Sequence, residues 1–80
     1  MIPPTVGATY RHFKGGEYIV RELSHHHDTG ELWVVYRNVL SGTVYHRALS
    51  SWIERVPRPG PTRDLVPRFK LIKDVHGTLV

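Results

Sequence analysis

Basic side chains that could hold an anion gather near both ends of the chain. Arg11, His12 and Lys14 lie just before a pair of glycines, and Arg68 and Lys70 lie in a basic stretch near the C-terminus. Guanidinium and ammonium groups make charge-assisted hydrogen bonds to phosphate and carboxylate oxygens, and glycine lets a ligand approach the backbone closely. We therefore interpret both groups as candidate binding residues for a phosphate-bearing ligand.

A third candidate, Arg47, lies between Tyr45 and Leu49 in a run that is otherwise apolar on that side. A half-buried arginine needs a carboxylate, a cluster of carbonyl groups or a bound anion as its partner. Of these, we expect a buried ion pair with Glu31 or Glu54. On that interpretation, Arg47→Ala would lower stability more than ligand affinity, because an abandoned buried carboxylate is costly.

Aromatic residues alternate with arginines in the middle of the chain, and Tyr36 is a further candidate for ligand contact. Single-stranded nucleic acids and nucleotide bases stack on such rings while basic groups contact their phosphates. In so small a domain most of the rings must lie in the core, so we expect one or two at the surface. The rings are Trp33, Tyr36, Tyr45 and Trp52, and the interleaved arginines are Arg37, Arg47 and Arg55.

Other chemistry has little support in the sequence. Histidines 25–27 and Asp28 are suitable ligand types for zinc or nickel, but adjacent loop histidines rarely converge on one ion. We expect a polar loop there, with no metal and no cofactor. There is also no Ser, His and Asp order, no paired carboxylates in a plausible cleft and no phosphate loop, so we predict a protein without catalytic activity.

Length and composition bound the architecture. Eighty residues with no cysteine and a formal net charge of +4 form one domain near the lower size limit of an unstapled core. We expect a core over about residues 7–73, frayed ends, and a monomer or homodimer. No run approaches the roughly 18 apolar residues of a membrane span, and the first residues lack a signal-peptide pattern. We expect a soluble, cytoplasmic protein that does not contact membranes.

The candidate residues must be positioned by short strands around a central hairpin with a polar joint at Ser41 and Gly42. Five short strands and a single helical turn favour a small, mainly β, SH3-like five-stranded barrel over a β-sandwich, which needs a longer chain. An exposed, proline-rich connection follows the helical turn and resembles either a polyproline ligand or a simple linker. The predicted strands are residues 8–14, 17–23, 32–37, 43–49 and 65–73, and the predicted helical turn is residues 51–55.

In an SH3-like barrel the first and last strands commonly lie side by side, so the two basic groups would merge. Strand alternation then places Lys14, His12, Arg68 and Lys70 on one exposed stripe, with Arg11 partly buried. The core is expected from Val20, Trp33, Val35, Leu49, Trp52, Ile53 and Phe69, with the choice between Trp33 and Val34 as the inward residue left open.

Several ordered motifs resemble a bacterial and phage family known as domain of unknown function 1653. The opening motif is Tyr-Arg-His-Phe-Lys-Gly at residues 10–15, and the closing motif is Val-Pro-Arg-Phe at residues 66–69. The resemblance covers roughly residues 7–72; Tyr45 and Ala48 stand where the family tends to have Trp and Pro. The family name carries no activity, so the resemblance implies the architecture only.

The leading hypothesis is a small binding module whose basic and aromatic face takes a nucleic-acid strand or a nucleotide. The excess of positive charge in residues 55–73 and the interleaved aromatics motivate it. The competing hypothesis is a protein-interaction domain, such as a phage or host inhibitor that covers a partner's nucleic-acid groove.

Overall fold

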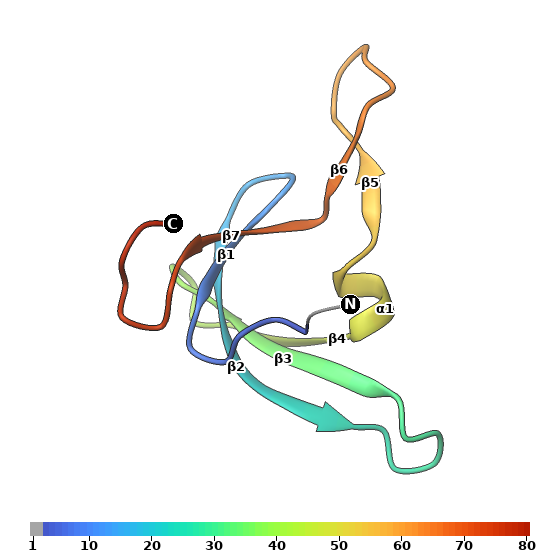
Figure 1. Cartoon of the computed structure of the whole chain (residues 1–80), viewed down its shortest axis with the longest axis vertical. Helices are drawn as coiled ribbons and strands as arrows, with labels where there is room; N and C mark the ends of the chain where they lie inside the picture. Colours follow the sequence, from blue (N-terminus) through green and yellow to red (C-terminus); the bar gives the residue numbers. More distant parts are fainter. Residues whose placement is uncertain (1–2) are drawn as a thin grey trace.

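Runs of β-branched and aromatic residues form most of the secondary structure in the computed structural model, which describes residues 3–80. Five strands pair antiparallel in the order β4-β3-β2-β1-β7, and β5 and β6 form a separate two-stranded ribbon that projects away from the sheet (Figure 1). The elements are β1 (Thr9–His12), β2 (Glu17–His25), β3 (Leu32–Asn38), β4 (Val44–Ala48), α1 (Leu49–Trp52), β5 (Arg55–Pro57), β6 (Leu65–Pro67) and β7 (Phe69–Lys73). None of the helices in this part of the chain is long and apolar enough to cross a membrane.

The central hairpin of β3 and β4 forms where the sequence predicts it. The Asn38 side chain accepts hydrogen bonds from the backbone N–H groups of Leu40 and Ser41, and Gly42 has a positive φ of 74° that suits a residue without Cβ. This turn sets the register in which Tyr36 lies opposite Tyr45. Both tyrosines therefore project from the same face of the sheet.

That face is concave and carries the core, but it is not the face of β3 that we expected. Val34 and Tyr36 are buried, whereas Trp33 and Val35 are half-buried on the convex side. The prediction of Trp33 and Val35 as core residues is wrong, because β3 is apolar on both faces and alternation alone cannot choose between them. Leu49 and Ile53 are also only partly buried and pack against the core.

A β-bulge in β2 explains why its apolar residues do not alternate cleanly. Val20 lies opposite Tyr36 and Glu22 lies opposite Val35, so Arg21 is an extra residue without a partner. The bulge returns Leu23 to the concave face that Val20 occupies, and it increases the local twist. Strand β2 is consequently bent over the core.

The sheet is strongly curled. Strands β4 and β7 are opposite edges, and four strand spacings would separate them by roughly 19 Å in a flat sheet. Yet the guanidinium carbon of Arg47 in β4 lies 5.7 Å from the ring centroid of Phe69 in β7. The two edges face each other, but no ladder joins them in residues 3–80, so the mainly β fold is confirmed and a closed SH3-like barrel is not.

Helix α1 covers the open side of this curled sheet. It starts at Leu49, earlier than the predicted helical turn at residues 51–55. Its last residue, Trp52, stacks on Phe69 with ring centroids 3.7 Å apart and planes 4° apart. The Tyr10 and Tyr36 rings also meet Trp52 at near-perpendicular angles, so this one side chain of the helix contacts three rings of the core.

The expected last strand, residues 65–73, is wrong as a single element. Pro67 has no N–H to donate, and at Arg68 the chain changes partners: its N–H donates to the Glu54 carbonyl and its carbonyl accepts from the Phe13 N–H. Strand β6 therefore pairs with β5, and β7 pairs with β1. The adjacency of the first and last strands is confirmed, whereas the ribbon partner β5 was not predicted.

We expect Trp52→Ala to lower the free energy of unfolding by about 3–5 kcal/mol, because it removes a buried ring that cannot be replaced by local collapse. Trp33→Ala, which truncates the half-buried tryptophan of the convex face, should cost clearly less. Urea unfolding of both variants measures the difference. Equal losses would contradict the assignment of the core to the concave face.

Candidate functional site

A cavity of about 180 Å³ remains on the concave face, near the seam between the two sheet edges. Its walls come from five strands, because cross-strand neighbours in register project from the same face. The lining residues are His12, Tyr18, Tyr36, Tyr45, Arg47 and Phe69. The cavity is thus a ring-lined space with one guanidinium group in its wall.

Within residues 3–80, Arg47 makes hydrogen bonds only to neutral groups. Its Nε donates to the Tyr36 hydroxyl oxygen at 3.2 Å, and its Nη1 donates to Ser51 Oγ at 3.0 Å. Of the two ion pairs in residues 3–80, neither includes Arg47. The predicted ion pair with Glu31 or Glu54 is wrong, since Glu31 lies exposed before β3 and Glu54 pairs elsewhere.

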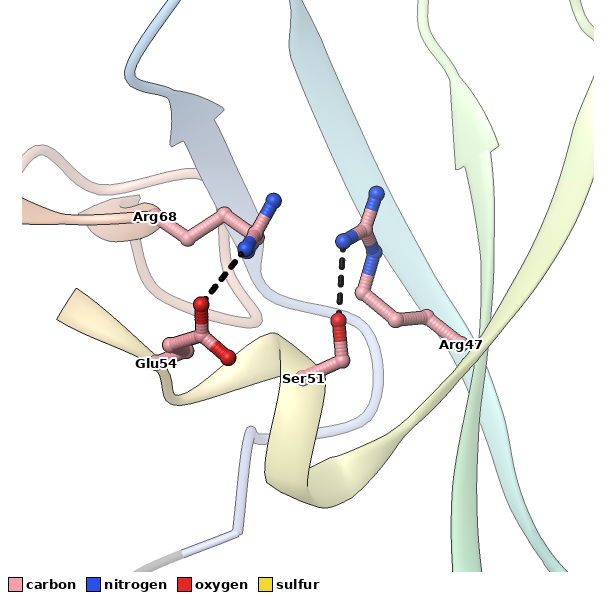
Figure 2. A network of polar contacts seen from close by, with 4 residues as sticks. All are labelled: Arg47, Ser51, Glu54 and Arg68. Carbon is pink, nitrogen blue, oxygen red and sulfur yellow. Dashed lines mark hydrogen bonds and ion pairs between the residues drawn. The ribbon is translucent and has the colours of Figure 1, made fainter. Parts of the chain in front are cut away.

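Arg68 takes the carboxylate that we had assigned to Arg47. Its Nη2 lies 3.2 Å from Glu54 Oε1, and Figure 2 shows the side chains of Arg47 and Arg68 extending toward each other above α1 from opposite sides. The Arg68 side chain is 19% exposed, whereas that of Glu54 is 59% exposed. An exposed carboxylate compensates a half-buried cation weakly, so the pair of arginines retains a positive field.

His12 reports this field. Its burial lowers its pKa from the ordinary value of 6.5, and the positive charges of Arg47, Arg68 and Lys14 lower the pKa further. The Nδ1 atom of His12 accepts a hydrogen bond from the Lys14 backbone N–H at 3.2 Å, which suits a neutral imidazole with its proton on Nε2. The cavity therefore disfavours any additional positive charge and favours an anion.

Arg11 and Lys70 project from the opposite side of the sheet. They lie opposite each other in the β1–β7 ladder, whereas His12 lies opposite Phe69 and points to the concave side. Arg11 is 59% exposed and pairs with Glu17 at 3.2 Å. The single exposed stripe predicted from Lys14, His12, Arg68 and Lys70 is therefore wrong, as is the partial burial of Arg11.

A second cavity, of about 620 Å³, lies on that side, between the end of β1 and the β5–β6 ribbon. It combines three basic residues with a mostly apolar floor. The lining residues are Arg11, His12, Phe13, Arg58, Pro59, Val66, Pro67 and Lys70. Lys14 lies in the adjacent turn, with its Nζ 5.5 Å from the Phe13 ring centroid.

Comparison with known proteins gives one consistent result. Residues 8–71 match the family described as "Protein of unknown function (DUF1653)". This chain belongs to the DUF1653 family. It is also similar to a crystal structure of a DUF1653 protein from Bordetella bronchiseptica, with 29% identity, a TM-score of 0.66, and 86% of this chain and 83% of that chain covered. No curated protein matches the chain.

The family membership predicted from the motifs is confirmed, and the family description assigns no activity. In this DUF1653 domain, the sequence-derived candidates His12, Tyr36 and Arg47 line the concave cavity, and Arg11 and Lys70 line the other. Arg68 does not line the concave cavity, but its charge acts on His12 there. Sequence reasoning missed Tyr18 and Ser51 as site residues. Tyr18 and Val20 are two residues apart in a strand, which predicts that they share a face of the sheet. The residues that lie opposite them on neighbouring strands depend on the turns, so the sequence did not place Tyr18 at the cavity.

The histidine run of this DUF1653 domain begins at the last residue of β2, His25, and continues into a polar loop. His26 Nδ1 accepts hydrogen bonds from the backbone N–H groups of Asp28 and Thr29, as a turn-capping side chain does. Within residues 3–80, no group of three or more His, Asp or Glu side chains is arranged to hold a metal ion.

We expect NMR titration to give His12 a pKa below 6.5, and Arg47→Gln to raise it, because one of the nearby positive charges is removed. Arg63→Gln is a matched control, since Arg63 is not among the causes of the shift. An unchanged His12 pKa in Arg47→Gln would contradict the field described above.

The same shift predicts a pH dependence of stability. The unfolded chain binds a proton at His12 near pH 6.5, whereas the folded chain binds it at a lower pH. The contribution of His12 to the free energy of unfolding is therefore fully present above pH 6.5, and it is lost as the pH falls toward the pKa of His12 in the folded state. Thermal unfolding of the wild type and His12→Gln between pH 7.5 and about 5 measures this, and parallel curves would contradict it.

Proposed function

We propose that this domain is a non-catalytic binding module for a phosphate-bearing ligand, a nucleic-acid strand or a nucleotide, and that it holds a phosphate at the concave cavity. The observation that carries the proposal is the half-buried guanidinium of Arg47, which lies beside Arg68 and whose hydrogen-bond partners in the described part of the chain are all neutral. A charge withdrawn from water without a counterion costs free energy, which a bound anion offsets.

The free donors of the two arginines favour phosphate. Nη2 of Arg47 and Nη1 of Arg68 make no hydrogen bond within residues 3–80, and Tyr36 and Ser51 fix the Arg47 side chain from behind. A guanidinium group presents its donors in a planar fork that matches the oxygens of a phosphate. Because the fork is already held, little side-chain entropy is lost on binding.

The aromatic walls favour a ligand that carries a base. Tyr45 is 44% exposed at the rim of the cavity, and its ring stacks on Tyr36 with centroids 5.8 Å apart. Exposed rings beside basic groups are the usual platform for unpaired bases. Inorganic phosphate would use the arginines but not this platform.

A protein partner is the second candidate, and one feature favours it. Strand β4 is an edge of the sheet, and Val44 and Tyr45 on it are about half exposed. An unpaired edge is a template for strand addition by another chain. Recovery of partners from lysate with and without nuclease separates the candidates: partners that survive nuclease favour a protein.

Titration with labelled single-stranded DNA, RNA and nucleotides at low and moderate salt tests the proposal. We expect salt-sensitive binding, and we expect Arg47→Met to weaken it roughly tenfold or more, since the variant keeps the methylene stem but removes the guanidinium. Its free energy of unfolding should change by only about 1–2 kcal/mol, because the lost hydrogen bonds go to neutral groups.

Arg21→Met is the matched control, because Arg21 is exposed at the bulge and lines neither cavity. It should leave binding nearly unchanged. A bound phosphate should also raise the His12 pKa, since a nearby negative charge stabilises the imidazolium. Absence of salt-sensitive binding to all of these ligands would end the proposal.

A further inference from the structure

The second cavity adds basic groups that a single phosphate at Arg47 does not use. Arg58 comes from the loop between β5 and β6, and Lys70 comes from β7. Neither takes part in the ion pairs of residues 3–80, and the only carboxylate paired in this region, Glu17, is bound to Arg11. The cavity is therefore a basic groove in which Arg58 and Lys70, unlike Arg11, have no carboxylate partner within residues 3–80.

The two cavities adjoin at His12, which lines both. Figure 1 shows the turn after β1 and the β5–β6 ribbon extending in the same direction, with the start of β7 between their bases. The backbone bond from the Phe13 N–H to the Arg68 carbonyl, 2.9 Å long, fixes this junction. A ligand held at Arg47 thus lies next to the entrance of the basic groove.

We infer that the ligand is a single-stranded nucleic acid whose chain continues from the concave cavity, past His12, into the groove of Arg58 and Lys70. The inference rests on the proposed function and specifies its ligand. A run of phosphates supplies one negative charge for each basic region, which a mononucleotide does not do.

The floor of the groove distinguishes this ligand from an acidic peptide. Phe13 is half-buried, and with Pro59 and Pro67 it offers flat or apolar surface between the basic groups. Bases have two apolar faces that pack on such surface, while the carboxylate side chains of an acidic peptide do not. A duplex, whose bases are already stacked on each other, gains nothing from these rings.

The experiment is a length series of thymidine oligonucleotides, with one, two, four and eight nucleotides, titrated over a range of salt concentrations. We expect affinity to rise between one and four nucleotides, and the slope of log affinity against log salt to steepen by roughly 0.7 for each added phosphate contact. A duplex of eight base pairs and a glutamate octapeptide serve as competitors, and both should bind more weakly than the octanucleotide.

Arg58→Glu and Arg63→Glu form the matched pair of variants. Both reverse one charge in the segment between β5 and β6, but only Arg58 lines the groove. We expect Arg58→Glu to weaken octanucleotide binding roughly tenfold and to lower the salt slope by roughly 0.7, the value for one phosphate contact on a single strand, while mononucleotide binding stays unchanged. Arg63→Glu should have a small effect on both ligands.

The outcomes separate this inference from the proposed function. If mononucleotides bind through Arg47 but length has no effect, or if the two Glu variants behave alike, the groove does not hold the strand and the phosphate site stands. Tighter binding of the duplex or of the peptide also overturns the inference. If neither mononucleotides nor oligonucleotides bind, the proposed function itself fails.

Discussion

The stacked rings of Trp52 and Phe69 hold together two parts of the sheet that no hydrogen-bonded ladder joins within residues 3–80. Trp52 ends the helix that follows edge strand β4, and Phe69 begins the opposite edge strand β7. Face-to-face contact at 3.7 Å between buried rings provides a large apolar area and a defined geometry. The curl of the sheet, the seam between its edges and the cavity in that seam all depend on this contact.

Edge strands β4 and β7 meet through side chains instead of a ladder, and this creates both the concave cavity of the candidate site and its positive charge. A ladder between β4 and β7 would bring the two backbones to within about 5 Å, so that the edges would meet through their backbones and not through rings. With rings as spacers, Arg47 lies over Phe69 and is fixed by two hydroxyl groups. The unpaired positive charge is thus a consequence of the open architecture, and it costs stability that the ring cluster supplies.

The sequence was sufficient for the features that depend on local pattern. The β3–β4 hairpin follows from Gly42 and the apolar runs around it. The adjacency of β1 and β7, by contrast, was expected only by analogy with an SH3-like barrel, whose closure the described residues do not show. The sequence was insufficient where two residues of the same kind could fill one position in the fold. Trp33 and Val34 are both apolar, so the pattern did not show which faces the core, and Arg47 and Arg68 are both charged, so it did not show which pairs with Glu54. The bulge at Arg21 has no local signature, because it is defined by its partner strand.

The two motifs that carry the family resemblance turn out to be one structural unit. Residues 10–15 end β1 and begin its turn, and residues 66–69 change strand partner from β5 to β1, so the motifs lie side by side. Alternation along them sends successive side chains to opposite sides: Arg11 to the groove, and His12 and Phe69 to the concave cavity. The two motifs together form the wall between the two cavities and supply residues to both. A substitution within either motif therefore alters both cavities unless each side chain stays on its own side of the sheet.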